Sequence, residues 1–190
     1  MTEMRARAAL AIVVGAAILV PIFADAHHID VTDGNDVRGL LDIRRVKTFG
    51  VTKPGFRVIT YSRWNKRDIF ERGFILVFFD TFGKERSEYY ALARSTATRM
   101  VASLYRDRRH KRDYEIGSVS AWRPDRRSVT IRVPLRKMNF GSERVFYRWY
   151  AETLFTGNRC RRVCFDFAPN NDVVIEPRPG ATPTPTTSSG

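Results

Sequence analysis

Oxygen-bearing side chains gather in one short stretch near the start of the predicted domain. The run Asp33-Gly34-Asn35-Asp36 is followed by Asp42, where the first predicted strand begins. Carboxylate and amide oxygens at short spacing, with a glycine that lets the loop bend, suit calcium. We expect a calcium cofactor whose ligands come from five residues: Asp33, Asn35, Asp36, Asp42 and Asp166. The spacing is not that of an EF-hand, and a polar turn that caps a strand is the alternative.

The three tryptophans are the second set of residues that could carry function. Trp64, Trp122 and Trp149 each lie on or next to a predicted strand. Exposed indole rings on a sheet face can stack on sugar rings while polar groups bind the hydroxyls. We therefore consider these tryptophans a candidate ligand-binding platform. The alternative is that they fill the hydrophobic core, where aromatic residues of strands usually lie.

Residues typical of catalysis do not form a recognisable pattern. The histidines are His27, His28 and His110, and the sequence has no Gly-x-Ser-x-Gly elbow and no Walker loop. No catalytic residue is assigned, and enzymatic activity stays uncertain. The rival hypothesis is a small secreted hydrolase that uses a pair of carboxylates, with Glu143 and Glu152 as candidates.

The two cysteines, Cys160 and Cys164, are close together in the chain. Outside the cytoplasm such a pair predicts a disulfide. A zinc site would need further ligands, and a redox site would need the spacing Cys-x-x-Cys. We expect a structural disulfide that fixes a loop.

The first residues have the order of a secretory signal. Arg5 and Arg7 precede the uncharged run Ala8–Phe23, and Ala24-Asp25-Ala26 offers small residues for cleavage. This order predicts a signal peptide over residues 1–26 and a secreted, extracellular protein. A retained anchor is the alternative. No later stretch is long and apolar enough to predict a transmembrane span.

The chain is strongly basic, with a formal net charge of +13 and a sequence pI of about 10.4. The densest basic run is residues 106–112. An anionic envelope polymer is one partner that would suit this charge. Nucleic acid is not expected as a partner, because the protein is predicted to be exported. A solvated basic surface is the alternative.

The body of the chain reads as β-strands separated by turns. The strands that we expect are rich in β-branched and aromatic residues and cover 41–49, 56–63, 74–81, 88–95, 99–106, 115–122, 128–133 and 145–155. Phe74–Phe79 is apolar on both faces, which is typical of a central strand covered twice. A helical turn is expected at 135–140. The pattern predicts an all-β domain over 27–176, a two-sheet antiparallel jelly-roll-like sandwich of about eight strands, followed by a disordered Pro/Thr/Ser-rich tail over 177–190.

Three of these motifs also resemble a known group. The run Asp33–Asp36 that leads to Asp42, the stretch Leu76–Thr81 and the turn Arg123-Pro124-Asp125 are similar to secreted actinobacterial β-sandwich domains of the DOMON group and of the family-nine carbohydrate-binding modules. The resemblance implies a jelly-roll-like sandwich with bound calcium and a sugar or haem ligand. Haem relatives use a Met and His pair, for which Met100, Met138 and His110 are the candidates here.

Together these observations predict a secreted, non-enzymatic binding module, with calcium as a stabilising ion. Its expected ligand is a carbohydrate or an anionic envelope polymer.

Overall fold

The computed structural model describes residues 28–50, 53–84, 86–141, 145–157, 160–170 and 172–178. The predicted signal peptide, residues 1–26, lies outside this part of the chain, and so does the predicted tail from residue 179 onward. The described residues form eleven strands and one short 3-10 helix. The all-β prediction is therefore confirmed.

Every strand expected from the sequence is present, and three further strands were missed. The matching strands are β2 (Ile43–Phe49), β3 (Gly55–Thr60), β4 (Gly73–Asp80), β5 (Tyr89–Ser95), β6 (Met100–Arg106), β7 (Tyr114–Asp125), β8 (Ser128–Arg132) and β9 (Phe146–Gly157). The three missed strands are β1 (Asp30–Thr32), β10 (Cys160–Ala168) and β11 (Val174–Pro177). The expected helical turn is the 3-10 helix η1 (Leu135–Lys137). The expected count of about eight strands is thus too low.

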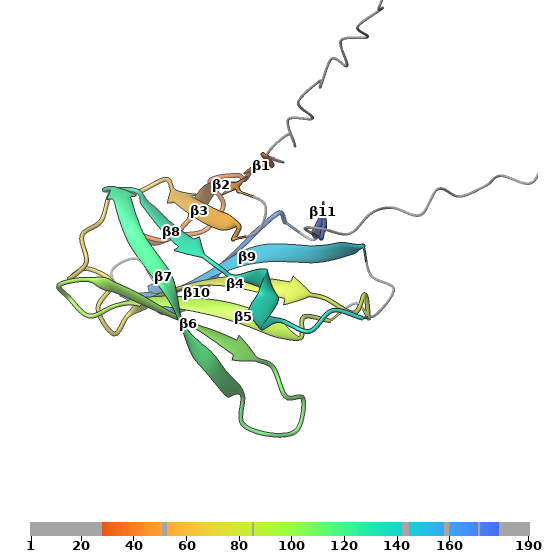
Figure 1. Cartoon of the computed structure of the whole chain (residues 1–190). Helices are drawn as coiled ribbons and strands as arrows, with labels where there is room; N and C mark the ends of the chain where they lie inside the picture. Colours follow the sequence, from red (N-terminus) through yellow and green to blue (C-terminus); the bar gives the residue numbers. More distant parts are fainter. Residues whose placement is uncertain are drawn as a thin grey trace, which may run out of the picture.

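The strands form one antiparallel sheet that curls into a half-barrel (Figure 1). Its order is β1-β2-β3-β8-β7-β6-β5-β4-β9-β10, and β11 pairs with β9 beside β10. The long strand β7 pairs with β6 through its first half and with β8 through its second half. Because β7 belongs to both halves, the two sheets that we expected are continuous with each other. The turn expected at Arg123–Asp125 belongs to the end of β7, and the turn itself is formed by residues 126–127.

The hydrophobic core lies inside the curl of the sheet. Phe56 of β3 stands near its centre, with its ring edge-on to Phe79 of β4 at 5.3 Å and to Trp149 of β9 at 5.2 Å. Edge-to-face contacts of this kind fix the relative position of rings from opposite halves of the sheet. The core therefore joins the β3 half to the β4 half.

The disulfide between Cys160 and Cys164 is confirmed, with their Cα atoms 5.7 Å apart. It closes a short loop at the start of β10, where the pairing of β10 with β9 is irregular between these two residues. Cys160 is buried against the core. The bridge therefore holds the irregular start of β10 in place.

Candidate functional site

Three aspartates that the sequence singled out lie together at the open edge of the half-barrel. Asp33 and Asp36 belong to the loop after β1, and Asp166 lies in β10. One carboxylate oxygen from each lies within 4.8 Å of the others. Two oxygens on opposite sides of a calcium ion are about 4.6–5.2 Å apart, so this spacing matches a calcium shell.

Asp166 is positioned by backbone contacts from both sides. Its carboxylate accepts hydrogen bonds from the amide of Ile43 in β2 and from the amide of Phe167, the latter at 2.8 Å. The residue is buried, because its side chain lies on the inner face of β10. This contact joins the two ends of the curled sheet and brings Asp166 to the β1–β2 loop.

Asp42 completes the acidic cluster, which we define as Asp33, Asp36, Asp42 and Asp166. Asp42 directly precedes β2 and is 3% exposed. Its Oδ1 atom is buried, and among the described residues nothing donates a hydrogen bond to it; the same holds for Oδ2 of Asp33. A buried carboxylate oxygen without a donor is costly unless a proton or a cation reaches it.

Burial and mutual repulsion shift the protonation of this acidic cluster. Burial, and then the nearby Asp33, raise the pKa of Asp166 to about 7. Burial, followed by repulsion from Asp36 and Asp33, raises the pKa of Asp42 to about 6. The pKa of Asp33 is raised as well, mainly by burial. In each case the surroundings disfavour the ionised carboxylate. A bound divalent cation would instead favour the ionised form.

Asn35, the fifth candidate ligand, has a different position. Its side chain is exposed, and it lines a neighbouring cavity of about 350 Å³ together with Asp42 and Tyr61. The cluster instead has a partner that the sequence did not single out. The side-chain amide of Asn170 donates hydrogen bonds to Asp33 Oδ1 at 2.8 Å and to Asp36 Oδ2 at 3.1 Å.

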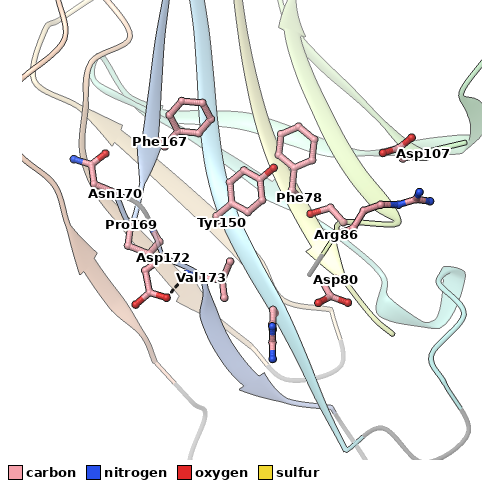
Figure 2. A pocket seen from close by; sticks show the side chains of 12 residues that line it. Phe78, Asp80, Arg86, Asp107, Tyr150, Phe167, Pro169, Asn170, Asp172 and Val173 are labelled. Carbon is pink, nitrogen blue, oxygen red and sulfur yellow. Dashed lines mark hydrogen bonds between the residues drawn. The ribbon is translucent and has the colours of Figure 1, made fainter. Parts of the chain in front are cut away.

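A groove of about 870 Å³ lies on the outer face of the sheet, next to Asn170 (Figure 2). Phe78, Tyr150 and Phe167 form its floor. Its rim carries charged and amide groups, namely Asp80, Arg86, Asp107, Arg148, Asn170 and Asp172. Apolar rings with polar groups around them are the common composition of a ligand-binding cleft.

The floor belongs to a row of five aromatic rings that crosses five neighbouring strands. Its members, in spatial order, are Tyr105 of β6, Tyr90 of β5, Phe78 of β4, Tyr150 of β9 and Phe167 of β10. The rings of Phe78 and Tyr150 are stacked, with centroids 4.8 Å apart and planes 11° apart. Tyr90 and Tyr105 are stacked in the same way at 5.1 Å. Strand spacing is close to these values, so the sheet itself sets the spacing of the row.

Asp80 places an unsatisfied acceptor in the groove. Its Oδ1 accepts hydrogen bonds from the amides of Phe82, at 3.0 Å, and Gly83, so the carboxylate is held at the end of β4. Its Oδ2 is buried and has no hydrogen-bond donor among the described residues. Because Asp80 lines the groove, a ligand hydroxyl could donate to this oxygen if the side chain turned towards the groove.

The three tryptophans do not form a common platform. Trp149 is fully buried in the core, and Trp64 is buried beneath the guanidinium of Arg123, which lies 3.7 Å from its ring centroid. Only Trp122 is exposed, and it lies in the half of β7 that pairs with β8, away from the residues that line the groove. The aromatic rings that line the groove therefore come from the aromatic row and not from the tryptophans.

The other sequence candidates are also dispersed. Glu152 lies on the outer face, opposite Leu76 and Phe167 in the neighbouring strands, and Glu143 lies outside the described residues. Met100 and Met138 are buried in the core, whereas His110 is exposed between β6 and β7. The structure therefore does not bring a Met and His pair together from these three described residues, and the pair of Glu143 and Glu152 lies partly outside the described part of the chain.

Comparison with known proteins finds no matching family model, no matching curated protein and no matching solved structure. Within the part of the chain that the structure describes, no helix has both the length and the apolar character that a membrane crossing requires. Function therefore has to be argued from the groove and the acidic cluster.

Proposed function

We propose that this protein is a non-enzymatic binding module that holds a neutral carbohydrate in the groove over Phe78, Tyr150 and Phe167. The observation that carries this proposal is the combination of an aromatic floor with the buried, unsatisfied Oδ2 atom of Asp80. A sugar ring offers an apolar C–H face for the rings and hydroxyl donors for the carboxylate.

The charge of the groove distinguishes between the two ligand classes that the sequence suggested. Although the chain carries a formal charge of +13, the groove is lined by the aspartates 80, 107 and 172 against only two arginines, 86 and 148. An anionic polymer would meet carboxylates there and be repelled. A neutral glycan can use both signs, because its hydroxyls donate to aspartate and accept from arginine.

The stacking of the rings supports binding without reorganisation. Phe78 and Tyr150 hold each other in place across β4 and β9, and both are half-buried. Ordering side chains on association costs free energy, so a floor that is already ordered favours affinity. The groove volume also lies within the range of about 300–1,000 Å³ that is usual for ligand sites.

A calcium ion at the acidic cluster is part of the proposal. The support is the buried Oδ1 of Asp42, which has no donor among the described residues, beside three carboxylates at calcium spacing. The ion would stabilise the β1–β2 loop against β10, since it would neutralise carboxylates that now repel one another. We also propose that the protein is related to the DOMON group and the family-nine modules, as the resemblance implies, because that resemblance includes the acidic run Asp33–Asp36.

The candidate that the sequence offered to the rival hydrolase does not line the groove, although three other carboxylates, those of Asp80, Asp107 and Asp172, do. Glu152 is not among the groove-lining residues, and the described residues place no partner carboxylate beside it. A binding role needs only the aromatic floor and the polar rim.

The test is binding to a panel of four neutral hexasaccharides, the β-1,4- and β-1,3-linked glucans, xylan and mannan, with polygalacturonate as the anionic comparison. We expect calorimetry to show saturable binding of at least one neutral member and none of polygalacturonate. Phe167→Ala should weaken that binding at least tenfold. This side chain is 41% exposed, so its removal leaves the fold intact.

The matched control is Tyr114→Ala, which removes an exposed ring of the same sheet that does not line the groove. It should leave affinity unchanged. The proposal fails if none of the four neutral hexasaccharides binds, or if the two variants behave alike. Release of reducing ends from any hexasaccharide would instead support the hydrolase.

A further inference from the structure

Asn170 belongs to both the acidic cluster and the groove. Its side-chain nitrogen donates to Asp33 and Asp36, while the residue lines the groove with Pro169, Asp172 and Val173. Figure 2 shows its amide directed away from the aromatic rings, with the rest of this wall beside Tyr150. The short stretch after β10 therefore contacts the carboxylates of the acidic cluster on one side and lines the groove on the other.

We infer that a calcium ion at the acidic cluster controls glycan affinity in the groove, and that Asn170 transmits the effect. This inference rests on the proposed function, because it assigns regulation to the same groove. We call Pro169, Asn170, Asp172 and Val173 the groove wall. The acidic cluster is more than a gathering of acids here, since the buried Asp42 Oδ1 lacks a donor among the described residues.

The chemistry of the Asn170 amide explains how the ion would act. Its NH2 group now contacts Asp33 Oδ1 and Asp36 Oδ2, one oxygen of each of two carboxylates in the acidic cluster. A cation repels the N–H dipoles of this amide, so binding of the ion at these carboxylates would weaken both hydrogen bonds. The amide also carries an oxygen, which is a preferred calcium ligand. Rotation of the amide would exchange two donated hydrogen bonds for a bond from Oδ1 to the ion.

The direction of the effect follows from what holds the wall in place. Without the ion, two hydrogen bonds of the Asn170 amide link the wall to carboxylates that repel one another. With the ion, the same residue is tied to a cation that also binds Asp33, Asp36 and Asp166. Calcium thus orders the groove wall before the glycan binds. Glycan binding then no longer carries the entropy cost of ordering the wall. Calcium should therefore tighten glycan binding.

Thermodynamic linkage makes the test quantitative. If calcium tightens glycan binding by some factor, the glycan must tighten calcium binding by the same factor. We expect a factor of about 5–20, within the usual range for coupled sites. Calorimetry with the best-binding hexasaccharide of the panel, in 2 mM CaCl2 or in EDTA, measures one side. Titration of CaCl2 with and without that hexasaccharide measures the other.

The decisive variant is Asn170→Ala. It keeps all four carboxylates, so CaCl2 should still raise its melting temperature, but the ratio of glycan affinities in calcium and in EDTA should fall to about one. Asn139→Ala is the matched control, since Asn139 is an exposed asparagine that lines neither site. In that variant the ratio should be unchanged.

A measurement without glycan separates this inference from the proposed function. CaCl2 alone should shift the methyl resonances of Val173, which lines the groove and is not part of the acidic cluster. It should not shift those of Val163, an exposed valine at the other end of β10. If no hexasaccharide binds, the proposed function fails and the Val173 shift alone decides the coupling. If a hexasaccharide binds equally in calcium and in EDTA, or Val173 does not respond, the coupling is overturned and the binding groove stands.

Discussion

The indole nitrogen of Trp149 donates a 3.0 Å hydrogen bond to the carboxylate of Glu176, and both residues are buried. The hydroxyl of Tyr147 donates to the other carboxylate oxygen. Trp149 and Tyr147 belong to β9, whereas Glu176 belongs to β11, so the carboxylate ties the last described strand to the core. Trp149, a candidate sugar platform from sequence, is thus a core residue with its polar atom satisfied.

We predict that Glu176→Gln destabilises the protein by about 1–3 kcal/mol, the usual effect of a lost charge-assisted hydrogen bond in a buried site. Glutamine has one acceptor oxygen for two donors, so with Oε1 on the indole its NH2 group faces the Tyr147 hydroxyl, which must then accept instead of donate, and both charge-assisted bonds are lost. Urea unfolding followed by tryptophan fluorescence measures the change. Glu115→Gln, at an exposed position of β7, should change the unfolding free energy by less than about 0.5 kcal/mol. Equal effects of the two substitutions would contradict the role of Glu176.

The strands that the sequence predicted share one property. Strands such as Phe74–Phe79 and Ser128–Val133 consist almost entirely of β-branched, aromatic or alternating residues, which form strands in most contexts. In the missed strands that signal is shorter or interrupted, and β10 shows it only from Val163 onward. β10 begins Cys160-Arg161-Arg162, and β11 is four residues long and ends in Pro177. They are strands because β9 offers both of them a backbone to pair with, which a local pattern cannot indicate.

The candidate site was predictable only in part, for a similar reason. The local acidic run predicted Asp33, Asp36 and Asp42, and Asp166 stood out as a carboxylate between phenylalanines. The aromatic row joins residues from five strands, and its spacing depends on their register. The sequence signal for the aromatic row was the apolar character of Phe74–Phe79 on both faces. We interpreted that stretch as a strand covered on both sides. Phe78 instead faces the groove.

The disulfide should contribute modest stability. Cys160 and Cys164 close a short loop, for which chain entropy gives about 2 kcal/mol. We predict that the double substitution of both cysteines by alanine lowers the free energy of unfolding by about 1–3 kcal/mol and preserves the far-UV circular dichroism spectrum. Alkylation should label neither cysteine before reduction and both after it. Labelling without reduction would show that the bridge is absent.

Glu152 should make stability depend on pH. Burial on the outer face of β9 raises the pKa of its carboxyl above the usual value for glutamate, so the folded state binds the proton more tightly than the unfolded state. Protonation of Glu152 therefore contributes fully to the stability of the folded state below the pKa of the unfolded state. This contribution is lost as the pH rises through the pKa of the folded state. We predict that Glu152→Gln raises the melting temperature at pH 7.5 by about 1–2 °C, a small effect because solvent screens this half-buried group.

The same substitution should leave the melting temperature at pH 3.5 nearly unchanged, because glutamine and protonated glutamate are both neutral and similar in shape. Glu71→Gln, at an exposed position, serves as the control and should have no effect at either pH. A stabilisation by Glu152→Gln that is equally large at both pH values would show that charge is not its cause.

The last prediction separates the aromatic row from the tryptophans as the site of glycan contact. Trp122 is 39% exposed and pairs with Thr130 of β8, and the guanidinium of Arg132 lies 5.7 Å from its ring centroid. It is the kind of ring that binds sugars in many proteins. It stands alone, however, since Trp64 and Trp149 are buried. A single exposed ring outside the groove offers little affinity.

We therefore predict that Trp122→Ala leaves the affinity for the bound hexasaccharide within about twofold of the original value, whereas Phe167→Ala lowers it at least tenfold. Both side chains are exposed to a similar extent, 39% and 41%, so the pair is matched for the apolar area that is removed from the surface. Calorimetry at constant calcium measures both affinities. A large loss with Trp122→Ala and none with Phe167→Ala would place the ligand on the β7–β8 half of the sheet, because Trp122 is the exposed tryptophan there, and would reject the groove as the binding site.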